Sequence, residues 1–135
     1  MKISNLIFTV SLLVITSFAN AQQIAIIPEP YQMKLGNGSY TLPKALVINA
    51  PASANTISDL ISKKMNAVTG NQVIKSSTKS NIDLQIINET ELGKEGYHLD
   101  VNEKGIQIKA NSNAGLFYAW QSLLQIMPTA VFKFA

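Results

Sequence analysis

The stretch that decides the fold is Gly96–Pro128, which reads GYHLDVNEKGIQIKANSNAGLFYAWQSLLQIMP. Apolar and polar residues alternate over 96–101 and again over 106–110, which is the two-residue period of a half-buried strand. Between these runs, Asn102–Gly105 has the composition of a tight turn, and Gly105 is free to take a positive φ. The pattern predicts a β-hairpin.

The hydrophobic period changes directly after the hairpin. Asn111–Asn113 offers side chains that can cap a helix N-terminus, and Pro128 ends the pattern that follows. Between them, apolar residues recur at the spacing of one broad helical stripe: Ala114, Leu116, Phe117, Trp120, Leu123, Leu124 and Met127. We therefore expect an amphipathic helix whose stripe, Phe117 and Trp120 included, packs in the core.

This stretch resembles the end of the N-terminal domain of family 20 glycoside hydrolases, the β-N-acetylhexosaminidases. Ile26–Leu42, IIPEPYQMKLGNGSYTL, is similar to the opening of the same domain. In that family a non-catalytic α+β domain precedes a (β/α)8 catalytic barrel. The resemblance implies such a domain over residues 22–128, with the apolar tail 129–135 as the start of a barrel that is missing here. A barrel needs about 250 residues, so none fits within this chain.

The rest of the chain adds strands and a second helix. β-rich runs occur at Ile24–Ile27, Ser39–Leu42, Ala45–Asn49, Gln72–Ser76 and Ile82–Ile87. A helix is expected from the entry at Pro51–Asn55 to Gly70, which sits where a C-terminal glycine belongs. The element order is then β-β-β-α-β-β-β-β-α. We expect an α+β fold, a two-layer arrangement of a single mixed or mostly antiparallel sheet with two helices on one face.

The first 21 residues read as a secretory signal. Met1-Lys2 gives a short basic start, Leu6–Phe18 is mostly apolar, and Ala19-Asn20-Ala21 is a small-x-small cleavage site. The apolar run is too short for a stable membrane span. We expect cleavage after Ala21 and a secreted or periplasmic protein, with an uncleaved anchor as the alternative.

Composition excludes several kinds of function. The chain of 135 residues has no cysteine, so disulfides, thiolate metal sites and a cysteine nucleophile are excluded. Its net charge is only +3, and all eleven basic residues are lysines. That excess is too small to indicate a nucleic-acid partner. Gly36-Asn37-Gly38 lacks the end of a phosphate-binding loop and reads as a turn. We expect no cofactor.

Candidate acid–base groups are few. The resembled family uses an adjacent Asp-Glu pair in its barrel, and this chain has no Asp-Glu dipeptide, so no catalytic residue is carried over. Glu89, Glu91 and Glu95 could form a catalytic cluster, but an acidic connection between strands is more often solvated. His98, the only histidine, has no metal-ligand spacing and is expected on the polar face of a strand. We expect no catalytic, cofactor-binding or metal-binding residue.

Aromatic residues support the main functional alternative. Side chains of the type that stack on sugar rings are Tyr31, Tyr40, Tyr97, Tyr118 and Trp120. Tyr118 lies off the apolar stripe, so a stand-alone carbohydrate-binding or interaction module remains open beside the accessory-domain interpretation. Asn37-Gly38-Ser39 and Asn88-Glu89-Thr90 match the glycosylation pattern. In a free domain, Val131, Phe132 and Phe134 would lack a partner, so self-association is also expected.

Overall fold

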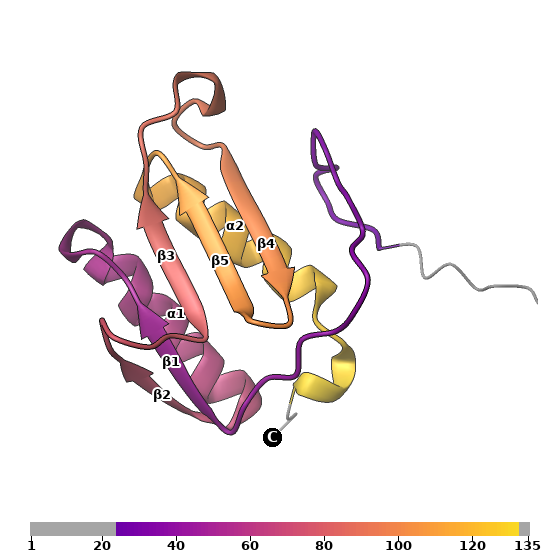
Figure 1. The fold of residues 1–135 in the computed structure, drawn as a ribbon, viewed down its shortest axis with the longest axis vertical. Coiled ribbons are helices and arrows are strands. Elements are labelled where there is room, and N and C mark those ends of the chain that lie inside the picture. Colours follow the sequence, from indigo (N-terminus) through magenta and orange to yellow (C-terminus); the bar gives the residue numbers. More distant parts are fainter. Residues whose placement is uncertain (1–23, 133–135) are drawn as a thin grey trace, which may run out of the picture.

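The computed structural model describes residues 24–132, and Figure 1 shows them as a sheet with two helices behind it. The predicted signal at residues 1–21 and the last residues of the tail, 133–135, lie outside the described residues. The strands are β1 (Ala45–Asn49), β2 (Gln72–Lys75), β3 (Ile82–Ile86), β4 (Tyr97–Asn102) and β5 (Gly105–Ala110), and the helices are α1 (Asn55–Thr69) and α2 (Asn113–Ile126). Short 3-10 turns occupy Ala52–Ala54, Thr90–Leu92 and Thr129–Val131.

The five strands form one sheet in the order β2-β1-β3-β5-β4. The pairs β1–β2, β1–β3 and β3–β5 are parallel, and only the hairpin pair β4–β5 is antiparallel. The α+β class, the mixed sheet and the helices on one face are therefore confirmed (Figure 1). The alternative description of the sheet as mostly antiparallel is wrong, because the crossover through α1 brings β2 back in the direction of β1.

The two earliest predicted strands are also wrong, since Ile24–Ile27 and Ser39–Leu42 have no regular structure. A β-rich run becomes a strand only if a neighbouring strand pairs with its backbone. The peptide groups of Ile27 instead bond to a side chain of α2. Ser39–Leu42 contributes packing rather than pairing, because Tyr40 and Leu42 lie partly buried against the core.

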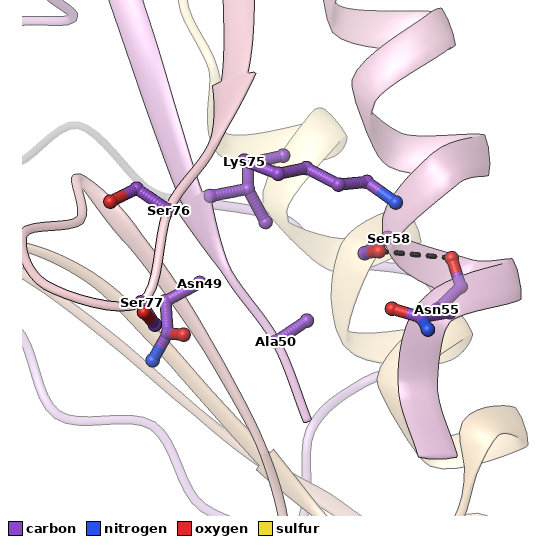
Figure 2. Close-up of a pocket in the computed structure, with 8 residues that line it drawn as sticks. Asn49, Ala50, Asn55, Ser58, Lys75, Ser76 and Ser77 are labelled. Atoms are coloured by element: carbon purple, nitrogen blue, oxygen red, sulfur yellow. Dashed lines mark hydrogen bonds between the residues drawn. The ribbon is translucent and has the colours of Figure 1, made fainter. Parts of the chain in front are cut away.

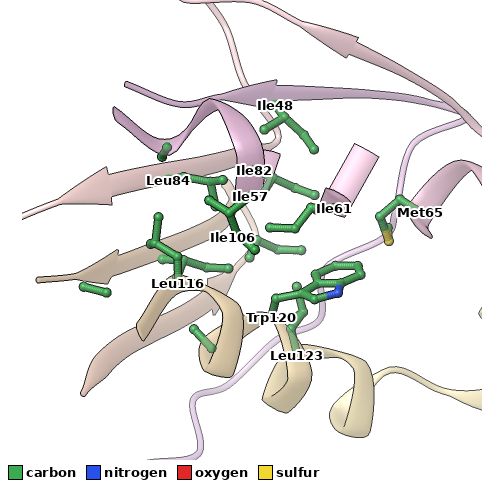
Figure 3. Close-up of a cluster of buried hydrophobic side chains, with 14 of the residues drawn as sticks. Ile48, Ile57, Ile61, Met65, Ile82, Leu84, Ile106, Leu116, Trp120 and Leu123 are labelled. Atoms are coloured by element: carbon green, nitrogen blue, oxygen red, sulfur yellow. The ribbon is translucent and has the colours of Figure 1, made fainter. Parts of the chain in front are cut away.

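The core lies between the sheet and the two helices. Ile48, Ile82 and Ile106 are neighbours in register across three strands, so their side chains point to the same face. Figure 3 shows side chains from the sheet and from both helices meeting in one cluster. The largest buried members are Leu46, Ile48, Ile61, Met65, Ile82, Leu84, Ile108, Leu116, Trp120 and Leu123. Burying each such side chain stabilises the fold by about 1.5–3 kcal/mol, so this cluster holds the two layers together.

Local signals around the hairpin and α2 are confirmed. In the turn, the backbone N–H of Lys104 donates to Oδ1 of Asn102 at 2.9 Å, and Gly105 has φ of 147°. Ser112 is the N-cap of α2, where its Oγ accepts from the backbone N–H of Ala114 at 3.1 Å. Gly70 ends α1 in the left-handed conformation, with φ of 65°. These caps and turns fix where the elements begin and end.

Candidate functional site

The outward side of α2 exposes two aromatic side chains on a helix without charged residues. We define the outer face of α2 as the residues of this helix that point away from the sheet: Ala114, Phe117, Tyr118, Gln121 and Gln125. Phe117 is 37% exposed and Tyr118 is 43% exposed. Their rings meet edge to face with centroids 5.9 Å apart. Two large aromatic side chains therefore stand together on the surface of one helix.

The exposed position of Phe117 corrects the sequence prediction that placed it in the core. Leu116, Trp120 and Leu123 follow one another at helical spacing and are buried against the sheet. Phe117 follows Leu116 by one residue, which turns it by about 100° around the helix axis. The inward side is therefore already filled, and Phe117 points outward.

The two helices differ in the number of charged residues that they carry. No residue of α2 is charged, because Asn113–Ile126 reads NAGLFYAWQSLLQI. By contrast, α1 exposes Asp59, Lys63 and Lys64 on its outward side. Large exposed apolar patches mark interaction sites, and the adjacent rings of Phe117 and Tyr118 form an exposed apolar patch on a helix without charge. The outer face of α2 is therefore the candidate functional site.

The opposite face of the sheet is polar. Asn49 Nδ2 donates to Asp83 Oδ1 at 2.7 Å, and Gln85 Nε2 donates to the other carboxylate oxygen of Asp83. A groove of about 320 Å³ on this face is lined by Glu89, His98, Asp100, Gln107 and Lys109. Among these five side chains, His98 and Glu89 contact each other, and Asp100 accepts instead from Nδ2 of Asn102 at 3.1 Å. Polar residues of this kind are usual on the solvated face of an antiparallel pair.

His98 lies on this polar face, as its alternation with Tyr97 and Leu99 predicts. Its Nε2 is 3.0 Å from Oε2 of Glu89, and both side chains are about half exposed. Glu91 and Glu95 are also exposed. Within residues 24–132, no group of three or more His, Cys, Asp or Glu side chains gathers closely enough to hold a metal ion. In the described part of the chain the histidine therefore contacts one carboxylate at an exposed position.

A second hollow lies where β1 and β2 end beside the start of α1 (Figure 2). Its volume is about 380 Å³, and its lining includes Asn49, Asn55, Ser58, Lys75 and Ser76. Ser58 Oγ donates to the carbonyl of Asn55 at 2.9 Å. The ammonium group of Lys75 reaches across to α1, where it forms an ion pair with Asp59. The lining holds no carboxylate or histidine for acid–base chemistry, so we assign this hollow no catalytic role.

The aromatic residues considered as a sugar platform are dispersed. Trp120 is buried in the core, and the hydroxyl of Tyr97 hydrogen-bonds with Oγ of Ser122. Tyr40 is half buried, and burial raises its pKa while the side chain of Asn81 partly offsets this effect. Tyr31 and Tyr118 remain exposed. Only Tyr118 stands beside another exposed aromatic ring, that of Phe117.

Sequence reasoning missed one contact beside the outer face of α2. The side-chain amide of Gln125 pairs with the backbone of Ile27 through two hydrogen bonds, of 2.8 and 3.0 Å. These residues are 98 positions apart, and a glutamine in a helix gives no signal of such a partner. The absence of charge from α2, in contrast, was readable in the sequence.

These features define a small α+β domain in which one of the two helices carries no charged residue. Residues 23–133 match the family model described as glycosyl hydrolase family 20, domain 2. The chain belongs to this family, so the resemblance noted in the sequence is confirmed. Within the described residues, none of the helices combines the length and the apolar composition needed to cross a membrane.

Known relatives are much longer than this chain. A lacto-N-biosidase of Bifidobacterium bifidum is 25% identical over 120 residues, which cover 83% of this chain and 10% of the relative. The structure of a family 20 β-N-acetylhexosaminidase from Streptomyces coelicolor A3(2) matches with a TM-score of 0.71 and 29% identity, over 78% of this chain and 22% of that one. A β-N-acetylhexosaminidase from Bacteroides fragilis matches with a TM-score of 0.63 and 26% identity, over 76% and 21%.

Proposed function

We propose that this chain is the non-catalytic accessory domain of a larger family 20 β-N-acetylhexosaminidase, and that it packs on the catalytic (β/α)8 barrel of that enzyme. The observation that carries the proposal is the match of residues 23–133 to a domain that fills only 22% of a related hexosaminidase. The reaction of the whole enzyme would be removal of a terminal N-acetylhexosamine from a glycan. The secretory signal predicted for residues 1–21 would suit an enzyme that meets its glycans outside the cytoplasm.

The outer face of α2 supports docking on a following domain. The exposed side chains of Phe117 and Tyr118 gain from burial, and no charge on this helix would have to be desolvated. The chain leaves α2 through Pro128 and the short turn Thr129–Val131. A domain that follows in the sequence would therefore begin at the end of the same helix.

Hydrolysis of an aryl N-acetylglucosaminide by two polypeptides tests the proposal. The chain of residues 1–135 should release no nitrophenol above a boiled control, because it lacks the Asp-Glu dipeptide that the resembled family uses. The complete gene product that contains this chain should release it. Turnover by residues 1–135 that a Glu-to-Gln change in this chain abolishes would overturn the proposal.

A second candidate is a stand-alone carbohydrate-binding module, which the exposed pair Phe117–Tyr118 favours. Exposed aromatic rings on one face can stack on sugars. Titration calorimetry of residues 1–135 with chito-oligosaccharides distinguishes this function from docking. Heat of binding that is lost in Tyr118→Ala would support the module, whereas no binding by the wild-type chain supports the accessory domain.

A further inference from the structure

We propose that the segment Ile27–Leu35, here called the N-terminal arm, forms one docking surface with the outer face of α2, and that Gln125 holds it there. The inference rests on the proposed function, because the occupant of this surface is the catalytic domain of the same polypeptide. It adds to that function a second contact element, which lies near the start of the domain and far from α2 in the sequence.

The attachment of the arm is a paired hydrogen bond. The backbone N–H of Ile27 donates to Oε1 of Gln125 at 2.8 Å, and Nε2 of Gln125 donates to the carbonyl of Ile27 at 3.0 Å. The amide of Gln125 thus satisfies the N–H and C=O groups of Ile27, which would otherwise need a neighbouring strand as a partner. A glutamine is suited to this role because its amide offers a donor and an acceptor side by side.

The arm has little other polar support. Among the hydrogen bonds within residues 24–132, those with Gln125 are the only ones that hold residues 24–39. The chain is held again further on, where Tyr40 and Leu42 pack against the core and Asn71 Nδ2 donates to the carbonyl of Pro43 at 3.2 Å. Gln125 therefore decides where the first half of this segment lies.

The arm exposes apolar side chains that the domain itself does not cover. Ile27 is 79% exposed, Tyr31 is fully exposed, Leu35 is 61% exposed and Met33 is 49% exposed. Together with Phe117 and Tyr118 of α2, they make up most of the large hydrophobic residues exposed within residues 24–132. Apolar groups gathered in two elements are typical of a surface that a partner buries.

The geometry joins the arm to the outer face of α2. Gln125 and Tyr118 are seven residues apart in one helix, so they lie on the same side of it two turns apart. The bonds of Gln125 therefore place Ile27 at one end of the stripe that carries Tyr118. In the proposed surface the rest of the arm, with Glu29 and Lys34 as its polar residues, extends this stripe beyond Ile27.

The location of this surface favours the catalytic domain over a second copy of the chain. Gln125 lies in the last turn of α2, which ends at Ile126, and the backbone continues through Thr129–Val131. The attachment point of the arm is thus beside the point where the chain leaves the domain. In related hexosaminidases a matched region of this kind is 21–22% of the whole, so a large domain is available to cover it.

Chemical labelling of exposed side chains tests the arm in the complete gene product, with residues 1–135 as the reference. Tyr31 and Tyr118 are nitrated, Met33 is oxidised, and the extent is read by peptide mass spectrometry. We expect all three to react in residues 1–135 and all three to be protected in the complete product. Gln125→Ala in the complete product should expose Tyr31 and Met33 again and leave Tyr118 protected. Gln121→Ala, which changes a glutamine one helical turn earlier, is the matched control and should expose none of them.

The possible outcomes distinguish a failure of the arm proposal from a failure of the proposed function. Protection of Tyr118 with unchanged labelling of Tyr31 would overturn the arm and leave docking through α2 intact. Labelling of all three residues in the complete product would overturn both, as would a gene product no longer than residues 1–135. Protection of Tyr31 that Gln125→Ala does not change would overturn the role of Gln125.

Trypsin cleavage tests the attachment in residues 1–135 alone. Lys34 is the only tryptic site in the arm, and Lys104 in the exposed hairpin turn is an internal reference. We expect Gln125→Ala to speed cleavage after Lys34 by about tenfold relative to Lys104, because two hydrogen bonds that oppose opening are lost. Gln121→Ala should leave the ratio unchanged. Equal cleavage ratios in the wild type and in Gln125→Ala would contradict the attachment.

Discussion

Gly115 of α2 lies directly against the backbone of Gly96, so closely that a Cβ atom on Gly115 would be 2.5 Å from the carbonyl oxygen of Gly96. The same atom would be 2.8 Å from Cβ of Ala110. Neither neighbour is a flexible side chain that could move aside. This contact sets how near the first turn of α2 approaches the sheet, and hence how the outer face of the helix is presented.

Gly115→Ala is therefore expected to destabilise the domain by about 1–3 kcal/mol, the usual cost of overpacking. Alanine is the better helix former by about 1 kcal/mol, but the clash with backbone should outweigh that gain. Urea unfolding measures the change. Gly36→Ala is the control, because a Cβ there meets nothing within 4 Å. A Gly115→Ala variant as stable as the wild type would contradict the close contact.

The chain of residues 1–135 is expected to self-associate through the outer face of α2. Sequence reasoning assigned this property to the apolar tail, but Val131 and Phe132 are half buried, and Phe134 lies outside the described residues. Phe117 and Tyr118 are more exposed and adjacent. Light scattering should show a mass that rises with concentration for the wild type and stays monomeric for Tyr118→Lys.

The control for self-association is Thr56→Lys, which adds the same charge on the exposed side of α1. It should associate as the wild type does. A wild-type chain that stays monomeric at high concentration would count against an uncovered apolar face.

The partial burial of Tyr40 is expected to make the free energy of unfolding depend on pH in the alkaline range. Burial raises its pKa in the folded state, so the folded protein keeps this proton when the unfolded chain, with a tyrosine pKa of about 10, has lost it. The stabilisation is present below pH 10 and is lost as the pH rises through the folded-state pKa. Tyr40→Phe should therefore lose less stability than the wild type between pH 9 and about 11. Tyr31→Phe, at a fully exposed position, should follow the wild type, and identical curves for all three proteins would refute the effect of burial.

The hairpin and α2 could be predicted because their signals are local. The turn at Asn102–Gly105 and the cap at Ser112 act within four residues of chain, and the structure shows both. Strand order depends instead on contacts such as Ile48 beside Ile82, which join distant residues. A sequence that shows one tight turn therefore could not reveal the three parallel pairings.

The candidate site was only partly predictable for a related reason. The apolar stripe of α2 is broad, so its period does not tell which of its residues meet the sheet, and the sequence prediction places Phe117 in the core. The structure turns Phe117 outward because Leu116 and Trp120 already fill the inward side. The arm could not be foreseen at all, since its position depends on one side chain, Gln125, at the other end of the domain.

The intact mass of the gene product, recovered from the secreted or periplasmic fraction, tests the central claim most directly. An accessory domain of a hexosaminidase should be recovered as part of a polypeptide several times heavier than the 14.7 kDa of residues 1–135, with the tryptic peptides of this domain and activity on an aryl N-acetylglucosaminide. A product whose mass corresponds to residues 22–135 would contradict the account, because no catalytic domain would then cover α2 and the arm.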